Sequence, residues 1–450
     1  MFSHLKTTGK TAGKHLLSFD AWKTRLVFWA GAVTVGLVAV AFALASEVAN
    51  DWFHIMHDSW ALAPLIVCPV GLAAVAFLTR NVFAGSQGSG IPQSIAALTM
   101  TEHSIRSKIL SLRIVFGKIL LTLIGILSGA SIGREGPTVH IGASIMFSLG
   151  RFANFPMHYM DRGLILAGSA AGIAAAFNTP LAGILFAIEE MSKSFEAKTS
   201  GTLLTAVFLA GITAVIIQGN YVYFGSSSST LTPIETLKPV LICGICGGLL
   251  GGIFSHVLIW STRRIAPLAN RHPYMLAATC GVFIALTGFL SGNLTFGTGY
   301  QEAKMVITGS GELPASYPLL KMLATLGSYL SGIPGGIFSP SLATGAGLGS
   351  TLSALMPGTE VGAVIILGMV GYFTGVVQTP ITAMVIVMEM TQDTALVLPL
   401  MATAFIAYIT SRIVCPESLY PALAKSFLGS GTQQKAATSA TAGPSDNRQQ

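Results

Sequence analysis

Apolar segments separated by short polar or glycine-rich stretches follow one another along most of the chain. Several of these segments are shorter than the roughly 20 residues that an α-helix needs to cross a bilayer perpendicular to its plane. Interrupted backbone at membrane depth is tolerated only where it is buried in protein or lines a cavity. We therefore predict an all-α polytopic membrane protein in which many helices are tilted, partial or re-entrant. The segments are 26–46, 59–79, 109–130, 135–149, 161–176, 179–191, 201–218, 237–260, 273–291, 314–331, 338–355, 360–376, 379–390 and 395–412.

The composition agrees with lipid contact over much of the surface. Of the 450 residues, 52% are hydrophobic and only 10% are charged, whereas soluble proteins contain about 25% charged residues. A large, wholly buried soluble core is the alternative, but such a core needs a charged surface around it. The 50 glycines favour close helix packing in a bilayer, because small residues let helix backbones approach one another.

The net charge of +7 would indicate nucleic acid or acidic partners in a soluble protein, but the basic residues here fall near the ends and in short connections. Cytoplasmic connections carry an excess of Lys and Arg, so both termini are predicted to be cytoplasmic and no nucleic acid partner is expected. The connection after the first segment contains Asp51 and Asp58 and is predicted to be external. The basic residues are Lys6, Lys10, Lys14, Lys23, Arg25, Arg263, Arg264, Arg271, Arg412 and Lys425.

The cysteines give no indication of a disulfide framework or a metal site. Cys243 and Cys246 have the spacing of a redox motif, but they lie in an apolar, glycine-rich stretch without a second pair or histidines at ligand spacing. The favoured interpretation is small residues within a membrane helix. We expect neither a bound metal nor a cofactor.

An internal repeat divides the chain into two halves. The segment 179–189, which begins Thr-Pro and ends in Glu, matches 379–389 at an offset of 200 residues, and 137–143 matches 340–346 at an offset of 203. In transporters, interrupted segments at corresponding positions of two halves are the best sequence indication of a binding site at the middle of the membrane. A coincidental match of these short strings is the alternative.

The predicted organisation is a cytoplasmic segment 1–24, a membrane domain 25–427 and a disordered tail 428–450. The membrane domain comprises two halves, roughly 25–220 and 233–427. The tail is rich in small and polar residues and has no periodicity, which is typical of disorder.

Two glycine-rich segments open predicted helices without contributing a charge. The segment 85–93, Gly-Ser-Gln-Gly-Ser-Gly-Ile-Pro-Gln, lacks the Lys of a phosphate-binding loop, but its free N–H groups and the Ser89 hydroxyl are available to an anion. The segment 335–340, Gly-Gly-Ile-Phe-Ser-Pro, supplies a helix start from the other half. Helix starts that converge on one anion would bind it weakly enough for rapid release, which conduction requires.

Glu135 lies at a third helix start, in Gly-Arg-Glu-Gly-Pro at 133–137. The N-terminal end of a helix is electropositive, so a carboxylate there can occupy an anion site itself or take a proton and leave. An acid at membrane depth is a functional hypothesis by default. A structural pair between Glu135 and Arg134 is the alternative.

Glu189 and Glu190 end the predicted helix that starts at Thr179. Adjacent helix positions point about 100° apart, so the two carboxylates need not share a role. A structural role is favoured for Glu189, because its repeat counterpart is Glu389. Proton transfer is favoured for Glu190, whose counterpart is Met390.

The segments Gly-Ser-Gly-Ile-Pro (88–92), Gly-Arg-Glu-Gly-Pro (133–137) and Gly-Ile-Phe-Ser-Pro (336–340) occur in this order in the chain. In sequence and order they resemble the three signature segments of the CLC chloride channel and transporter family, and the similar layout runs from about 25 to 427. The resemblance implies a CLC-type fold of two inverted-topology repeats and a homodimer with one pathway in each subunit. It further implies a prokaryotic-type protein of the bacterial inner membrane, without CBS domains after the membrane core.

The resemblance also implies roles for individual residues. Glu135 would be the external gate, because its deprotonated side chain competes with the anion and its protonated form swings out. Glu190 would transfer protons on the inner side. The residues expected to bind the anion are Ser89, Tyr420, Ile337, Phe338, Glu135 and Gly136.

Two residues can be compared with the family: Ser89 within the first signature segment and Gln93 directly after it. In the family, Ser at the position of Ser89 accompanies chloride, whereas Pro accompanies nitrate and Met accompanies fluoride. Ser89 therefore favours chloride. Gln93 departs from the commoner Glu at its position, which leaves the electrostatics near the inner vestibule open.

Glu135 and Glu190 together predict coupled exchange of chloride for protons. The nearest alternative is an uncoupled voltage- or pH-gated chloride channel on the same scaffold. An intramembrane enzyme with Ser89 as nucleophile and His140 as base is a third hypothesis, disfavoured because no hydrolase signature surrounds Ser89. We expect chloride, protons and membrane lipid as partners and no enzymatic activity.

Overall fold

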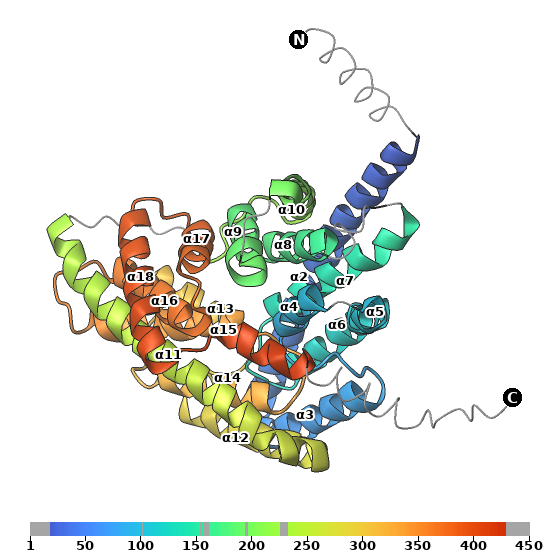
Figure 1. Cartoon of the computed structure of the whole chain (residues 1–450). Helices are drawn as coiled ribbons and strands as arrows, with labels where there is room; N and C mark the ends of the chain where they lie inside the picture. Colours follow the sequence, from blue (N-terminus) through green and yellow to red (C-terminus); the bar gives the residue numbers. More distant parts are fainter. Residues whose placement is uncertain are drawn as a thin grey trace, which may run out of the picture.

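The structure is a computed structural model of the chain, and it describes residues 19–100, 102–153, 155, 162–193, 197–225 and 233–428. Within these ranges the chain is almost entirely helical, and the only β-type pairings are two isolated bridges (Figure 1). The cytoplasmic segment expected before residue 19 and the disordered tail expected after residue 428 lie outside the described residues.

Helices of very different length make up the two halves. The helices of the first half are α2 (Phe19–Ser59), α3 (Pro64–Asn81), α4 (Ile91–Thr99), α5 (His103–Ile109), α6 (Leu112–Leu127), α7 (Glu135–Leu149), η1 (Gly150–Phe152), α8 (Leu164–Phe177), α9 (Pro180–Phe186), η3 (Ala187–Ser192) and α10 (Ala197–Gln218). Those of the second half are α11 (Pro233–Arg271), α12 (Pro273–Leu290), α13 (Tyr300–Ile307), α14 (Tyr317–Leu330), α15 (Phe338–Ser353), α16 (Val361–Val377), α17 (Pro380–Thr391) and α18 (Val397–Val414).

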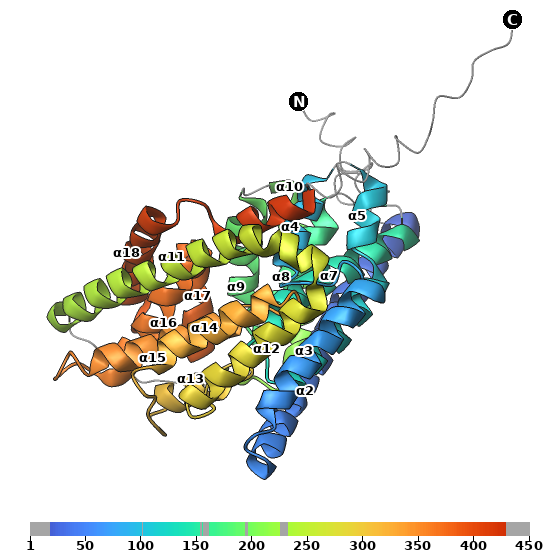
Figure 2. The same cartoon turned by 90° about the horizontal axis from the view of Figure 1, so that it is seen from below.

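Seven helices of the described residues are long and apolar enough to cross a membrane. The longest, α2 and α11, contain 41 and 39 residues. At 1.5 Å per residue each is about 60 Å long, twice the roughly 30 Å of the hydrocarbon core, so they must tilt or project from it. Figure 2 shows both as long rods with shorter helices between them. By contrast, α7 and α8 contain only 15 and 14 residues, as the broken apolar pattern predicts.

Glycines bring the helices behind the predicted anion site into close contact. A Cβ atom at Gly142 of α7 would lie 2.2 Å from the carbonyl oxygen of Gly168 in α8, and the reverse also holds. In the second half, a Cβ atom at Gly368 of α16 would lie 2.4 Å from the Cα atom of Gly349 in α15. Two of the three helices that begin at a signature segment, α7 and α15, are therefore packed backbone against backbone.

The two copies of the Thr-Pro repeat cap each other. The Glu189 carboxylate accepts a hydrogen bond from the backbone N–H of Thr382 at 2.6 Å, at the start of α17. Reciprocally, Glu389 accepts one from the N–H of Ala182 at 2.7 Å, at the start of α9. Each acid neutralises the electropositive start of the other half's helix. The structural role predicted for Glu189 is confirmed.

Candidate functional site

Backbone hydrogen bonds join the three signature segments. Gly88 donates to Ile333 at 3.1 Å and accepts from Gly335 at 3.3 Å. Gly133 and Gly336 exchange two hydrogen bonds, each of 2.7 Å. The segment 335–340 of the second half therefore contacts both segments of the first half, so the starts of α4, α7 and α15 meet at one place.

Ser89 lies at this meeting point with a free hydroxyl. Its side chain is completely buried, and its Oγ has no hydrogen-bond partner among the described residues. A Cβ atom at Gly136 would lie only 2.4 Å from this Oγ, so the hydroxyl lies against the first turn of α7. Buried hydroxyls nearly always have a partner, and an anion would supply one here.

Glu135 is the first residue of α7 and is 1% exposed. Its Oε1 accepts a hydrogen bond of 2.6 Å from the Ser339 hydroxyl, while Oε2 has no partner within the described part of the chain. Arg134 turns away and forms an ion pair of 3.3 Å with Glu47 of α2. The alternative in which Glu135 and Arg134 form a structural pair is therefore not observed.

Ile337 and Phe338 form the start of α15. The first N–H groups of a helix have no partner within it and carry partial positive charge. The ring of Phe338 is fixed edge to face against Phe373, with centroids 4.5 Å apart, and contacts Phe177 and Phe186 at 5.8 and 6.2 Å. This aromatic cluster holds the helix start, and its N–H groups, in position.

Tyr420 and Glu190 lie close to one another and to Glu135. Tyr420 is completely buried, its hydroxyl has no hydrogen-bond partner among the described residues, and it interacts electrostatically with both Glu190 and Glu135. Glu190 is 2% exposed and lies in the π-helical turn η3, with Oε1 unpartnered within the same ranges. Such turns are frequent at functional sites. As predicted, Glu189 and Glu190 have separate surroundings.

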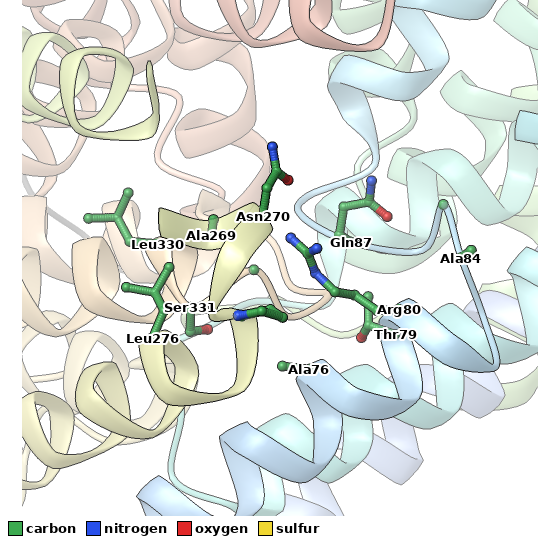
Figure 3. Close-up of a pocket in the computed structure, with 13 residues that line it drawn as sticks. Ala76, Thr79, Arg80, Ala84, Gln87, Ala269, Asn270, Leu276, Leu330 and Ser331 are labelled. Atoms are coloured by element: carbon green, nitrogen blue, oxygen red, sulfur yellow. The ribbon is translucent and has the colours of Figure 1, made fainter. Parts of the chain in front are cut away.

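Two neighbouring pockets that share lining residues lie near the segment that precedes α4. One, of about 450 Å³, is lined by Gly88, Gln87 and Tyr329 among others. The other, of about 360 Å³, shares Gln87 and Asn270 with it. Figure 3 shows the side chains of Arg80, Gln87 and Asn270 in the lining of this second pocket. Arg80 therefore places a positive charge in a pocket that also contacts Gln87.

A small pocket lies near Glu135 on another side of the site. Its lining includes Glu47, Arg134 and Tyr223, and Tyr223 interacts with Ser339, the partner of Glu135. One pocket therefore lies beside Gly88, which precedes Ser89, and another lies beside Arg134, which precedes Glu135.

The geometry does not support the hydrolase hypothesis. The Nε2 atom of His140 pairs with the carbonyl oxygen of Ile109 at 3.0 Å, and neither Nδ1 nor the Ser89 hydroxyl has a hydrogen-bond partner among the described residues. The nucleophile and base of a hydrolase need a mutual hydrogen bond. The described residues also contain no group of three or more His, Cys, Asp or Glu side chains that could hold a metal.

Sequence reasoning missed three residues near the site: Ser339, Tyr223 and Lys118. Ser339 stands inside a signature segment, so its motif could have indicated it. Lys118 is a lone charge within the predicted span 109–130, and such charges inside a membrane indicate function. Tyr223 follows α10 in a connection whose sequence carries no comparable signal.

Comparisons with known proteins agree with this geometry. Residues 70–412 match the family model described as voltage gated chloride channel. The H(+)/Cl(-) exchange transporter ClcA of Yersinia pseudotuberculosis serotype IB (strain PB1/+) is 30% identical over 446 residues, covering 92% of this chain and 90% of that protein. The ClcA protein of Citrobacter koseri is 29% identical over 454 residues, covering 95% and 93%.

Solved structures show the same fold. The crystal structure of a slow cyanobacterial Cl−/H+ antiporter matches with a TM-score of 0.78 and 25% identity, over 90% of this chain and 98% of that one. A CLC-type fluoride/proton antiporter matches with a TM-score of 0.77 and 23% identity, over 90% and 99%. The predicted all-α, CLC-type membrane fold is confirmed.

Proposed function

Because this chain belongs to the voltage gated chloride channel family, we propose that it exchanges chloride for protons across the membrane. The observation that carries the proposal is the position of Glu135, a buried acid at a helix start, opposite the helix start that bears Ser339. The relatives named as H(+)/Cl(-) exchange transporters support exchange over an uncoupled channel. The protein is a multi-pass membrane protein.

The proposed anion site consists of the hydroxyls of Ser89 and Tyr420 together with N–H groups at the starts of α7 and α15. Both hydroxyls are buried without a partner among the described residues, which favours a bound anion. The N–H groups are those of Glu135, Gly136, Ile337 and Phe338. Chloride is the proposed anion because Ser89 offers a hydroxyl in place of the residues that accompany nitrate or fluoride.

In the proposed cycle, Glu135 is the gate. As a carboxylate it occupies the electropositive place between helix starts and excludes the anion; as a neutral acid it leaves, and the anion enters. Glu190 exchanges the proton with the inner solution, and its electrostatic interaction with Tyr420 supports a role beside the same path. A carboxyl group can serve both as a mimic of the anion and as a proton carrier, which couples the two fluxes.

The proposal extends to assembly and location. We propose a homodimer with one pathway in each subunit, in the bacterial inner membrane, with both termini in the cytoplasm and without enzymatic activity. The exposed apolar side chains of α10 and α18, such as Phe208, Ile216, Ile409 and Ile413, provide surface for a partner subunit or lipid. Cysteines placed on α10 or α18 can be cross-linked in native membranes. This test distinguishes a face that is covered by a partner subunit from one that is covered by lipid.

Flux measurements in proteoliposomes test the function. A chloride gradient should drive protons uphill through the wild-type protein. Glu135→Gln should abolish proton movement and retain chloride flux, and Glu190→Gln should stop protons while chloride still moves. Glu312→Gln, at an exposed acid outside the site, is the matched control and should retain coupling. Chloride flux in the wild-type protein without proton movement would establish the uncoupled channel instead.

A further inference from the structure

Lys118 of α6 is a buried lysine directly beside the proposed anion site. Its side chain is completely buried, and its Nζ donates a hydrogen bond of 3.0 Å to the carbonyl oxygen of Gly88. A Cβ atom at Gly90 would lie 3.1 Å from the same Nζ. The ammonium group therefore contacts the residues on both sides of Ser89. His140 interacts with it electrostatically.

The second half contains the counterpart of Lys118. Lys321 of α14 lies 203 positions later, at the same offset as the repeat that pairs α7 with α15. Its Nζ donates to three carbonyl oxygens, those of Thr295, Phe296 and Gly297, at 2.9, 3.3 and 2.9 Å. It also interacts electrostatically with the buried carboxylate of Glu302. This lysine has both hydrogen-bond partners and a counter-charge.

The two halves differ at the acid. Gly88 and Gly90 precede α4 as Gly297 and Gly299 precede α13, and in this alignment Gln93 stands where the second half has Glu302. Gln93 is 1% exposed, and its amide nitrogen donates to the carbonyl oxygen of Gln87 at 2.5 Å. Its amide oxygen has no partner in the described ranges, and no carboxylate within them forms an ion pair with Lys118.

We propose that the anion bound at Ser89 is the counter-charge of Lys118, and that Gln93 strengthens anion binding by leaving this cation without an acid. The inference rests on the proposed function, since it concerns the same site. A helix start offers about half a unit of positive charge, whereas the ammonium group offers a full one. An isolated buried charge is costly, so a resident anion stabilises Lys118 as much as Lys118 stabilises the anion.

Replacing Gln93 tests the proposal. Gln93→Glu restores the acid and should weaken chloride binding roughly tenfold or more, because it adds a negative charge in the buried surroundings of Lys118 and the anion. Gln93→Leu removes the amide without adding charge and should bind chloride more tightly than Gln93→Glu. Lys118→Met removes the cation and should weaken binding by a similar factor. Gln392→Glu, which adds the same charge at an exposed position, should retain the wild-type affinity.

The measurement is calorimetric titration of chloride into the purified full-length protein at constant ionic strength, with size-exclusion chromatography to establish that each variant is folded. Equal affinity of Gln93→Glu and the wild-type protein would overturn the role of Gln93 while leaving the exchanger proposal intact. An equal loss in Gln93→Leu and Gln93→Glu would attribute the effect to shape and overturn the charge argument. A wild-type protein that binds no chloride would overturn both proposals.

Discussion

Glu135 is held by one hydrogen bond from Ser339, and its second carboxylate oxygen has no partner among the described residues. A hydrogen bond to a charged group contributes about 1.5–3 kcal/mol, which is small enough for protonation to release the side chain. In the proposed cycle the same bond disfavours entry of an anion, because the carboxylate occupies the electropositive place. Ser339 therefore influences how strongly Glu135 competes with chloride.

Replacing Ser339 should shift this competition toward the anion. In Ser339→Ala the Glu135 side chain loses this hydrogen bond, so chloride should bind at least about tenfold more tightly. Calorimetric titration measures the affinity. Ser353→Ala, a serine at the far end of α15, is the control. Weaker chloride binding in Ser339→Ala would show that Ser339 contacts the anion instead.

Gly136 is required by close contact with Ser89. A Cβ atom at Gly136 would lie 2.4 Å from the Ser89 hydroxyl and 3.3 Å from the Cα atom of Gly336. Gly136→Ala should therefore displace Ser89 and weaken chloride binding at least tenfold, as measured by calorimetry. Gly201→Ala, where the added methyl group meets nothing within 4 Å, should bind chloride like the wild type. Wild-type affinity in Gly136→Ala would contradict the placement of Ser89.

Helix ends, more than helix bodies, carry the specific interactions between the halves. The carboxylates of Glu189 and Glu389 end one helix of each half and cap the start of the other, and the Thr382 hydroxyl adds a hydrogen bond of 2.7 Å to Glu189. Side chains that cap a helix start typically contribute about 1 kcal/mol. Since the two caps are reciprocal, losing either one loosens the same contact between α9 and α17.

Removal of a cap should lower stability without abolishing transport chemistry. Glu389→Gln and Glu189→Gln should each lower the free energy of unfolding by about 1–2 kcal/mol, seen as a lower midpoint of thermal unfolding in detergent. The double variant should lose less than the sum, because the two caps stabilise one contact. Glu312→Gln serves again as the control. An unchanged midpoint in both single variants would refute the capping role.

The sequence predicted the functional helix starts better than the helix lengths. The segment 135–149 was predicted as a helix and is α7, because Gly and Pro mark its start. By contrast, the segment 26–46 is only the middle of α2, which continues to Ser59 through polar residues that favour a helix but not lipid. The short helices α5 and α13 contain too few apolar residues in a row to give a signal.

Partners from the opposite half could not be predicted from the sequence. The motifs indicated Ser89, Glu135 and Glu190 because each breaks a local apolar pattern. The hydrogen bond from Ser339 to Glu135, and the absence of an ion pair at Lys118 among the described residues, depend on which segments meet in space. The repeat supplied part of this information, since it aligned Glu189 with Glu389, but it did not show that each acid caps the other half.

At the scale of the whole molecule, an ionic contact ties the end of the described chain to the longest helix of the second half. Glu417 follows α18 and accepts hydrogen bonds from Lys425 at 2.5 Å and from Arg263 of α11 at 2.6 Å. These hydrogen bonds, Lys425 first, lower the pKa of the Glu417 carboxyl. The contact fixes the stretch that carries Tyr420, so it supports the Tyr420 side of the proposed anion site.

This contact should make stability depend on pH. The folded-state pKa of Glu417 is below its unfolded value of about 4.5, so its contribution is complete above pH 4.5 and is lost as the pH falls through the folded-state pKa. The contribution is modest because the group is partly exposed. Glu417→Gln should lower the thermal midpoint at pH 7, and the difference from the wild type should shrink toward pH 3. A difference that is constant across this range would contradict the assignment.

The hydrogen bond from Ser339 to Glu135 joins residues that are 204 positions apart in the sequence, so the two residues are synthesised at different times. A ribosome adds roughly 5–20 residues per second, so about 10–40 s separate the synthesis of Glu135 from that of Ser339. Throughout this interval the newly made first half contains Glu135 and Lys118 without the segment that completes their surroundings. The rate of translation therefore helps to determine how much correctly folded transporter a cell obtains. Any factor that keeps the incomplete first half out of contact with lipid has the same effect.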